Sequence, residues 1–358
     1  MKRIYLLIDS LGSGGAQRQI VELAVLLKER RNEVLVGYYH PIHFYQPFLD
    51  RHGIPYQLIP NAVSGWRRIG CVRQSIRTFQ PDTVISYLDT PNIISCLLLA
   101  TGMKFRLIAS ERNTTQEFSL RERVKFFLLR MANAVVPNSF SQGKFIYEHF
   151  PRLAPKVTVI TNFVDTKTFS PAQQQKDRNV EHKLRILVVG RVTKQKNVMR
   201  FLLTIKRLRD EGHSFFVDWY GYRGSDSEHQ WTDFIRNERL DTVFRFHEPS
   251  QNIVTCYREA DIFVLPSIYE GFPNVLCEAM SCGLPVACSN VCDNPMIVKN
   301  SYNGFLFDPL SVDDMAEKLR HLLTLSDYER STMGHRSREI ALHLFSVDKF
   351  VDAYESLI

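Results

Sequence analysis

The first half of the chain alternates short apolar runs with longer stretches in which apolar residues recur every three or four positions. Short runs are typical of buried strands and the longer stretches of amphipathic helices, so their order indicates βα units on a parallel sheet. We predict strands at Arg3–Ile8, Glu33–Tyr38, Thr83–Ser86, Leu107–Ser110, Ala134–Pro137 and Val157–Thr161. Helices are predicted between them at Ala16–Glu29, Ile69–Phe79, Ile93–Thr101, Arg121–Met131 and Ser141–Tyr147.

The second half repeats this alternation after an interruption. Periodicity is lost between Asp165 and Lys183, where Gln, Asp, Lys and Pro dominate, which indicates a linker over 166–183. We predict further strands at Leu184–Val189, Phe215–Tyr220, Val243–Phe246, Ile262–Leu265 and Val286–Cys288. The accompanying helices are predicted at Asn197–Asp210, Ser227–Glu238, Ile253–Glu259, Val275–Cys282 and Val312–Leu323.

The pattern therefore predicts an α/β protein of two doubly wound, Rossmann-like domains, and 358 residues suffice for two such cores. We expect the first domain over 1–165 and the second over 184–340. A helix in 341–358 is expected to pack back on the first domain. Ligands of such folds bind at the carboxyl ends of the strands, so two facing domains would place a site in the cleft between them.

Composition narrows the class of protein. The longest apolar candidate, Ile93 to Met103, is too short to span a bilayer, and the N-terminal apolar run breaks at Asp9, so we expect an unexported protein. Seven cysteines form no C-x-x-C pair and no His-flanked zinc spacing, which fits a reducing cytoplasm and predicts no metal site.

Charge is unevenly distributed along the chain. Residues 1–170 hold 22 Lys and Arg against 12 Asp and Glu, or +10, while the remainder holds 23 against 26, or −3. A basic first half indicates that this domain meets an anionic partner, although an unselected surface imbalance would look the same.

A glycine-rich turn, Leu11-Gly12-Ser13-Gly14-Gly15, lies between the first predicted strand and the first helix. Three glycines in this position allow positive φ angles and a close backbone approach to a ligand, and a plain tight turn is the alternative. A dinucleotide-binding fingerprint would need glycine at Gln17 and an acidic residue after the second strand, where Tyr38-Tyr39-His40 stands. The dehydrogenase interpretation therefore fails.

The strongest signal lies in the second half, where a buried strand leads through Glu270 and Gly271 into a helix that begins near Asn274. On this helix one face, expected to pack on the sheet, carries Val275, Leu276, Ala279 and Met280, and the opposite face carries Asn274, Glu278 and Ser281. The unpaired N–H groups of its first turn suit sugar hydroxyls or phosphate, and Glu278 lies where a carboxylate could accept both hydroxyls of a ribose. Two ordinary exposed glutamates remain the simpler alternative.

Glu270 and Glu278 stand in S-x-x-E-G-F-P-x-x-x-x-E-A-M-x-x-G-x-P-V, which resembles the signature of the retaining glycosyltransferases of family 4, with their two-domain GT-B fold. The resemblance continues in matching order along the chain. Asp9 to Arg18 resembles the family's donor-phosphate loop, Val159 to Asp165 its interdomain segment, Val189 to Asn197 its diphosphate clamp, and Phe305 to Pro309 its next turn.

The resemblance implies a role for each matching residue. Arg191 and Lys196, after Gly190, would neutralise the diphosphate of a UDP-sugar donor, Glu278 would hold the ribose and Glu270 would face the sugar. Backbone donors would come from the turn and helix start, and Gly14 and Gly15 would let the first domain close on the phosphates. The donor-contacting set is Gly14, Gly15, Gly190, Arg191, Lys196, Glu270, Gly271, Phe272, Pro273, Asn274, Val275 and Glu278.

Two departures from the family pattern stand out. Arg112 follows Ser110-Glu111 where many members have histidine, so a cation rather than an imidazole would serve the leaving phosphate or an anionic acceptor. Phe163 stands where glycine is usual. The implied mechanism is front-face displacement with Glu270, Arg191, Lys196 and Arg112 in the catalytic set, needing neither metal nor cofactor.

The segment from Phe118 to Asn133 mixes Arg121, Arg123, Lys125 and Arg130 with bulky apolar residues. Such a basic amphipathic helix favours binding to the inner face of a membrane, but a core helix with one solvated basic side fits equally well. With the basic first domain, this segment favours a glycan acceptor carried on a polyprenyl diphosphate, as in bacterial surface-glycan assembly, and we expect no nucleic-acid partner.

Two other functions stay open at this point. A non-catalytic protein that binds anionic surfaces would explain the charge but not Glu270 and Glu278. A nucleotide-sugar epimerase of the same two-domain fold would convert the donor without an acceptor. The sequence leaves the transferred sugar, a hexose or N-acetylhexosamine, undetermined.

Overall fold

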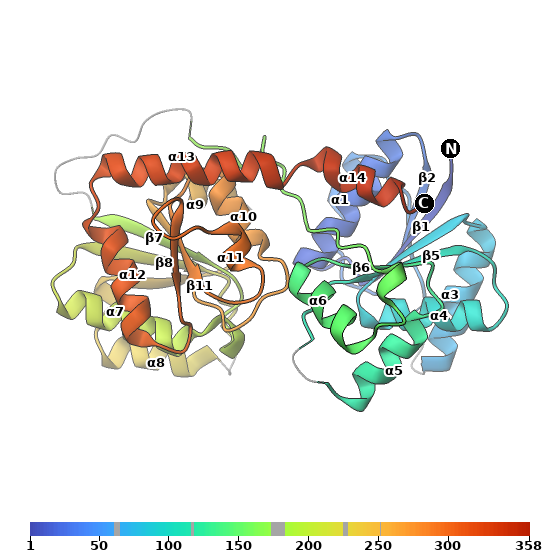
Figure 1. Cartoon of the computed structure of the whole chain (residues 1–358), viewed down its shortest axis with the longest axis horizontal. Helices are drawn as coiled ribbons and strands as arrows, with labels where there is room; N and C mark the ends of the chain where they lie inside the picture. Colours follow the sequence, from blue (N-terminus) through green and yellow to red (C-terminus); the bar gives the residue numbers. More distant parts are fainter. Residues whose placement is uncertain (61–64, 116–117, 173–182, 225–227, 251) are drawn as a thin grey trace. The chain divides into compact units, whose positions relative to one another are not determined.

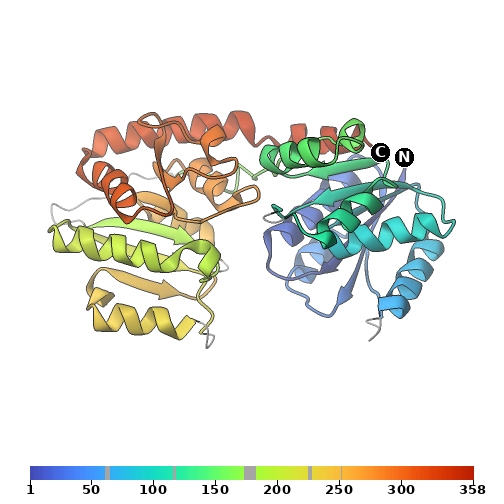
Figure 2. The same ribbon diagram turned by 60° about the horizontal axis from the view of Figure 1, so that its bottom comes forward.

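The computed structural model describes residues 1–60, 65–115, 118–172, 183–224, 228–250 and 252–358. The chain divides into two compact units, the first made of Met1–Phe163 with Val347–Ile358 and the second of Val164–Ser346. Each unit is a parallel sheet with helices on both faces (Figures 1 and 2). The doubly wound α/β prediction is therefore confirmed.

The sheet of the first unit has the order β3-β2-β1-β4-β5-β6, and all its strand pairs are parallel. Its strands are β1 (Arg3–Ser10), β2 (Glu33–His40), β3 (Tyr56–Leu58), β4 (Thr83–Tyr87), β5 (Arg106–Glu111) and β6 (Ala134–Pro137). Its helices are α1 (Gly15–Glu29), α2 (Gln46–Arg51), α3 (Gly65–Phe79), α4 (Asp89–Ala100), α5 (Leu120–Leu129), α6 (Phe140–His149), η1 (Ala154–Lys156) and α14 (Val347–Glu355).

Strand β1 shows why this sheet needs helices on both sides. Ile4, Leu6 and Ile8 point into a core shared with α1 and α14, whereas Tyr5 and Leu7 point into a second core shared with α3, α4 and α5. Because alternate side chains of a strand face opposite ways, an unbroken apolar run can be buried only between two helical layers.

The second unit repeats the topology, with the order β12-β11-β10-β7-β8-β9 and parallel pairs throughout. Its strands are β7 (Leu184–Val189), β8 (Phe215–Tyr220), β9 (Phe244–His247), β10 (Ile262–Leu265), β11 (Val286–Ser289) and β12 (Gly304–Phe307). Its helices are η2 (Lys194–Lys196), α7 (Val198–Asp210), α8 (His229–Asn237), η4 (Leu240–Thr242), α9 (Ile253–Glu259), α10 (Asn274–Ser281), α11 (Asn294–Ile297), α12 (Val312–Thr324) and α13 (Asp327–Leu344).

The structure corrects several predicted elements. Residues 157–161 form no strand and contribute only a single bridge, from Val157 to Val135, while the short strand β3 and the last strand β12 were not predicted. Residues 341–344 end the long helix α13, and the segment that joins the first unit begins at Val347. Most of the expected linker, 173–182, and the first residue of the helix expected over 227–238 lie outside the described residues.

Among the described residues, no helix combines the length and apolarity needed to cross a membrane. In each sheet the strand order reverses between the first and fourth strands in sequence, β1 with β4 and β7 with β10. The carboxyl edge at such a switch point is where doubly wound sheets bind ligands. The candidate residues after β7 and β10 therefore lie where this fold binds its ligands.

Candidate functional site: the carboxyl edge of the second sheet

The loops that follow β7 and β10 are hydrogen-bonded to each other at the switch point of the second sheet. The backbone N–H of Ile268 donates to the carbonyl of Gln195 at 2.9 Å, and the Gln195 side chain donates back to the carbonyl of Tyr269 at 3.0 Å. Next to this junction Lys196 Nζ lies 2.5 Å from Glu270 Oε1. The structure thus brings together two predicted site residues that belong to different motifs.

The backbone at the end of β7 approaches that of β8 very closely. Gly190 and Gly221 have φ angles of +153° and +130°, and a Cβ on Gly221 would lie 2.2 Å from the Gly190 carbonyl oxygen. The indole N–H of Trp219 donates to the same oxygen at 2.8 Å. Glycine is therefore required at both strand ends. Sequence analysis missed Gly221, although a glycine directly after a predicted strand was an available signal.

The two predicted phosphate-binding cations differ in their surroundings. The side chain of Lys196 is 15% exposed and packs over Gly190, so that a Cβ there would lie 3.2 Å from Lys196 Cε. Arg191 is exposed and forms no hydrogen bond or ion pair with the part of the chain that the structure describes. The site thus offers one cation fixed by a carboxylate and one still available to an incoming anion.

The turn from Glu270 to Val275 leads into the start of α10. Glu270 is buried, with 8% of its surface exposed, and Phe272 packs against Phe345 with ring centroids 6.0 Å apart. Helix α10 begins at Asn274, follows Gly271 and Pro273, and has no side-chain cap at its N-terminus. No side chain caps this first turn, and the N–H groups of Asn274 and Leu276 donate to the backbone carbonyls of Phe272 and Pro273 at 3.0 Å.

Glu278 is buried, which argues against the alternative that it is an ordinary exposed glutamate. It is 2% exposed, and its Oε2 accepts a hydrogen bond from the Tyr257 hydroxyl at 2.9 Å. Helix α10 is buried on both sides from Leu276 to Ser281. Tyr257, on α9, is a site residue that sequence analysis missed, because nothing local to its sequence marks it as a partner of Glu278.

The second side of α10 is covered by α13, which sequence analysis did not predict as a separate helix. Gly334 lies against the loop that ends α10, since a Cβ on it would approach the Gly283 carbonyl oxygen to 2.1 Å. Arg338 adds a hydrogen bond to the carbonyl of Ser281 at 2.6 Å. Helix α13, which is distant in the sequence, thus covers the side of α10 that would face solvent if α10 packed only on the sheet.

The loop after β11 adds a site residue, Cys292, that no sequence motif indicated. Cys292, partly buried and with φ +50°, is hydrogen-bonded to the backbone of Glu270. Burial raises the pKa of its thiol, the negative charges of Asp293 and Glu270 raise it further, and the hydrogen bond to Glu270 lowers it. This loop therefore belongs to the same site as Glu270.

In the first unit, the glycine turn does not use the positive φ angles that its glycines allow. Gly14 has φ −86° and caps α1, and Gly12 and Gly15 also lack positive φ angles. The Gln17 side chain folds back to donate to Asp9 Oδ1 at 3.0 Å, and a Cβ on Gly14 would collide with it. The small residues here serve close packing rather than left-handed geometry.

Arg112 lies directly after β5 and is 7% exposed. Its two terminal nitrogens donate to Asn162 Oδ1 at 2.6 Å and to the Tyr354 hydroxyl at 2.5 Å. The guanidinium lies over the ring of Tyr87 at 3.9 Å. Arg112, expected to serve a substrate phosphate or an anionic acceptor, is thus a firmly held residue inside the first unit.

Lys125 does not belong to a membrane-facing set, so that part of the prediction was wrong. It is 4% exposed and pairs with Glu111 at 2.9 Å, Glu122 at 2.7 Å and Asp89 at 3.3 Å. Burial raises the pKa of Glu111, while the Lys125 charge opposes that rise. The other three basic residues of this segment, Arg121, Arg123 and Arg130, are exposed.

The outer face of α5 is apolar as well as basic. Leu120 is 76% exposed, Val124 52% and Phe127 64%, and their spacing of four and three residues puts them on one side of the helix. Phe126 and Leu129, on the other side, are fully buried in the core. One helix therefore carries both a core face and an exposed face that is apolar and basic, and binding of that face to a membrane stays a prediction.

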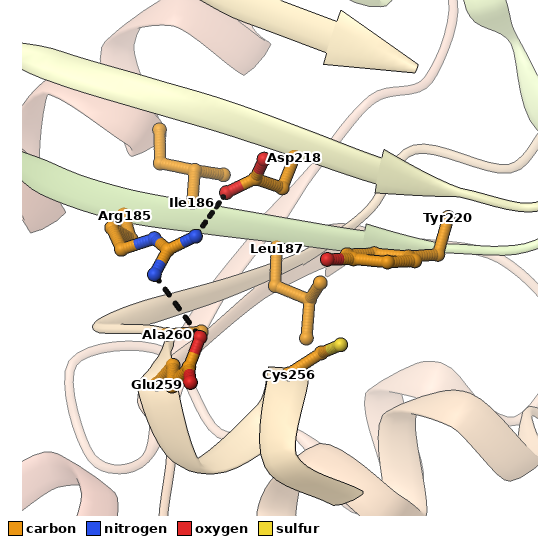
Figure 3. A pocket seen from close by; sticks show the side chains of 8 residues that line it. All are labelled: Arg185, Ile186, Leu187, Asp218, Tyr220, Cys256, Glu259 and Ala260. Carbon is orange, nitrogen blue, oxygen red and sulfur yellow. Dashed lines mark hydrogen bonds and ion pairs between the residues drawn. The ribbon is translucent and has the colours of Figure 1, made fainter. Parts of the chain in front are cut away.

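A separate small cavity lies over β7 and β8 (Figure 3), and none of the residues that line it belongs to the Glu270 loop. Its volume is about 10 Å³, and Arg185 pairs with Asp218 at 3.0 Å and with Glu259 at 3.1 Å. A cavity of this volume holds about one water molecule and is too small for a nucleotide. The network instead ties β7, β8 and α9 together.

Comparisons with known proteins agree with this geometry. Residues 13–168 match the family model "Glycosyltransferase Family 4", and residues 169–339 match "Glycosyl transferases group 1". Together the two matches run without a gap across the strand edges just described. The chain belongs to the GT-B glycosyltransferases, and polysaccharide biosynthesis is the setting of its relatives.

Two relatives and one solved structure illustrate the relationship. The chain is 24% identical, over 94% of its length and 92% of the relative, to a Campylobacter jejuni enzyme named GalNAc-alpha-(1->4)-GalNAc-alpha-(1->3)-diNAcBac-PP-undecaprenol alpha-1,4-N-acetyl-D-galactosaminyltransferase. It is 29% identical, over 56% of its length and 54% of the relative, to the Escherichia coli UDP-Gal:alpha-D-GlcNAc-diphosphoundecaprenol alpha-1,3-galactosyltransferase. Anabaena Alr3699/HepE in complex with UDP-glucose superposes with a TM-score of 0.86 at 18% identity, covering 100% of both chains.

Proposed function

We propose that this glycosyltransferase moves a hexose or N-acetylhexosamine from a UDP-sugar to a glycan carried on a polyprenyl diphosphate, with retention of anomeric configuration. The observation that carries the proposal is the Lys196–Glu270 pair beside Gly190, at the switch point of the second sheet. A cation, a close backbone approach and a carboxylate are there together, as a diphosphate joined to a sugar requires. A UDP donor and diphosphoundecaprenol acceptors in the names of the two relatives support the same choice.

In this proposal, different residues of the second unit bind different parts of the donor. Arg191 and Lys196 neutralise the diphosphate, the positive end of the α10 dipole faces it, and Glu270 meets the sugar. Glu278, held by Tyr257, takes the ribose hydroxyls. In the first unit, the Gly14–Gly15 turn is proposed to offer backbone N–H groups to a substrate phosphate.

The proposed reaction is a front-face displacement at the anomeric carbon. The bond from that carbon to the diphosphate oxygen breaks while a bond to the acceptor hydroxyl forms on the same face. The acceptor's proton passes to the departing phosphate oxygen, so the products are UDP and the glycoside. Two carboxylates flanking the bond, as in glycosidases, are not part of this route. Most of the acceleration comes from holding the diphosphate's developing charge and positioning the acceptor.

We also propose that no metal ion is needed. In metal-dependent transfer, the ion neutralises the leaving diphosphate. Here Arg191 and Lys196 bring two positive charges to that position, and Lys196 is already oriented by Glu270.

The first unit is proposed to rest on the inner face of an anionic membrane through α5. Leu120, Val124 and Phe127 would enter the headgroup boundary, with Arg121, Arg123 and Arg130 around them. An exposed apolar stripe flanked by arginines is the pattern of helices that lie in a membrane interface. This placement would bring the enzyme to a lipid-linked acceptor and keep it on the cytoplasmic side.

A donor screen tests the proposed function. We expect thermal stabilisation by UDP-sugars but not by GDP-sugars, and transfer to a polyprenyl-diphosphate-linked N-acetylhexosamine with α-configured product by NMR. An isomerised sugar formed from UDP-sugar without acceptor would identify an epimerase instead. Heparin retention without any nucleotide binding would favour a non-catalytic surface-binding protein.

A further inference from the structure

Arg112 is held in place from two directions by neutral groups. One terminal nitrogen donates to Asn162 Oδ1 at 2.6 Å and the other to the Tyr354 hydroxyl at 2.5 Å. The flat face of the guanidinium lies over the Tyr87 ring, with its carbon 3.9 Å from the ring centroid. Two hydrogen bonds and one stacked face leave the group little freedom to rotate.

Tyr354 reaches this point from the far end of the chain. It lies on α14, which packs beside α1 in the first unit (Figure 1), and its side chain is fully buried. Besides Arg112, its hydroxyl receives a hydrogen bond from the Tyr87 hydroxyl at 3.0 Å and lies 3.2 Å from Ser110 Oγ. The last helix therefore fixes the residue that follows β5.

The charge of Arg112 has no counter-ion in the described part of the chain. None of the ion pairs found there includes Arg112, and its Nε is buried without a hydrogen-bond partner. A buried cation surrounded by neutral groups is unfavourable, because neutral dipoles replace only part of its lost hydration.

Lys125 provides a direct comparison, because it is equally buried and belongs to the same region. Three carboxylates, from Asp89, Glu111 and Glu122, surround its ammonium group. Glu111 is the residue immediately before Arg112, yet its side chain turns to Lys125 and Asn92 instead. Among the residues that the structure describes, one buried cation thus has counter-ions and its neighbour has none.

We propose that Arg112 binds a substrate phosphate and that Tyr354 and Asn162 are positioning residues that hold its guanidinium ready. A fixed guanidinium with unused N–H donors matches the bidentate geometry of phosphate oxygens. The inference rests on the proposed function, in which both donor and acceptor carry a diphosphate. It assigns a function to the last helix, which would otherwise be only a packing element.

The test compares Arg112→Gln, Arg112→Lys and Tyr354→Phe with the parent. The control is Tyr5→Phe, which removes another buried hydroxyl from the same unit, one bonded to Ser75 Oγ at 2.6 Å. Calorimetry with UDP, uridine and inorganic pyrophosphate measures the phosphate contribution to binding. Steady-state kinetics use a polyprenyl-diphosphate-linked N-acetylhexosamine and, for comparison, the same sugar on an uncharged alkyl chain.

We expect Arg112→Gln to weaken phosphate binding at least tenfold. Arg112→Lys should weaken it less, because lysine keeps the positive charge but lacks the paired N–H donors of the guanidinium group. If the dissociation constant of UDP rises and that of uridine does not, the phosphate belongs to the donor. If UDP binding is unchanged and only the KM for the diphosphate-linked acceptor rises, the phosphate belongs to the acceptor. Pyrophosphate binding tests the Arg112 site without any transfer reaction. A failure of the proposed transfer function can therefore be distinguished from a failure of the proposed phosphate site.

Tyr354→Phe should weaken the same binding step several-fold, while Tyr5→Phe leaves it unchanged. In the Arg112→Gln background, Tyr354→Phe should have no further effect on affinity, since a positioning residue acts only through the group that it holds. The proposal is overturned if the Arg112 variants lose thermal stability like Tyr5→Phe but bind UDP, pyrophosphate and both acceptors as the parent does. In that case Arg112 only fastens α14 to the sheet.

Discussion

Lys196 Nζ and Glu270 Oε1 lie 2.5 Å apart although 74 residues separate them in the sequence. Their loops follow β7 and β10, neighbouring strands whose carboxyl ends form the switch point of the second sheet. The pair puts a fixed positive charge at the place where a donor diphosphate is proposed to bind. It also keeps the Glu270 carboxylate oriented before any ligand arrives.

Replacing Lys196 by Ala should raise the dissociation constant of UDP about ten- to hundredfold, since a charge-assisted hydrogen bond is worth about 1.5–3 kcal/mol. Isothermal calorimetry measures this directly. Lys206→Ala on α7, which removes a lysine paired with Asp210 on the outer surface, is the matched control and should bind UDP normally. Equal affinity in the two variants would remove Lys196 from the phosphate site.

Replacing Glu278 by Ala should weaken UDP more than it weakens pyrophosphate, because Glu278 is assigned to the ribose. Tyr257→Phe should show a smaller loss of the same kind, since its hydroxyl holds Glu278 Oε2 at 2.9 Å. Calorimetry with the two ligands separates these effects, and Glu259→Ala, at an exposed ion pair of the same unit, serves as control. A parallel loss for both ligands would argue against a ribose contact.

Transfer activity should persist in excess EDTA, with the initial rate unchanged. Arg191 and Lys196 are expected to supply the charge that a divalent ion would otherwise bring to the diphosphate. Arg191→Ala should therefore reduce the rate, and added magnesium should not restore it. Complete loss of parent activity in EDTA, reversed by magnesium, would contradict this prediction.

The outer face of α5 should bind anionic vesicles reversibly. Each arginine near such a surface is worth about 1 kcal/mol, and the attraction fades over a Debye length of about 8 Å at physiological salt. Replacing Arg121, Arg123 and Arg130 by Gln should abolish co-sedimentation with phosphatidylglycerol vesicles. Replacing Leu120, Val124 and Phe127 by Ser should weaken it while leaving the charge unaltered.

The control for the α5 variants changes three arginines and lysines elsewhere on the same unit, Arg31, Arg51 and Lys104, to Gln. These side chains are exposed, so net charge falls equally without touching α5. If this control loses vesicle binding as fully as the α5 variants, net charge rather than the helix face controls attachment. UDP affinity should be the same in all three proteins.

Alkylation of Cys292 should report on the donor site. Because burial raises the pKa of this thiol, little thiolate is present at neutral pH, and labelling by iodoacetamide should quicken as pH rises toward that raised pKa. A bound UDP-sugar should slow labelling of Cys292, measured by peptide mass spectrometry, and leave Cys71 of the first unit unaffected. Unchanged labelling of Cys292 at saturating donor would place it outside the site.

Local pattern was enough to predict most of the sheet architecture. Strands such as Leu184–Val189, Phe215–Tyr220 and Ile262–Leu265 agree with the structure residue for residue, because an apolar run between turn residues has few alternatives in a doubly wound fold. The Glu270–Glu278 motif was likewise readable from spacing and glycine content. Strand β3, with only three residues, was too short to leave a recognisable pattern.

The sequence by itself determined the order of strands and helices and the position of the charged motifs along them, since these depend on residues near one another in the chain. Only the tertiary structure decided which side chains are enclosed. Glu278 is buried because α13 covers α10, Lys125 turns inward because three carboxylates meet it, and Arg112 is held by a tyrosine 242 residues away. Burial and pairing of a side chain depend on remote elements packing against it, and periodicity along one helix cannot report them.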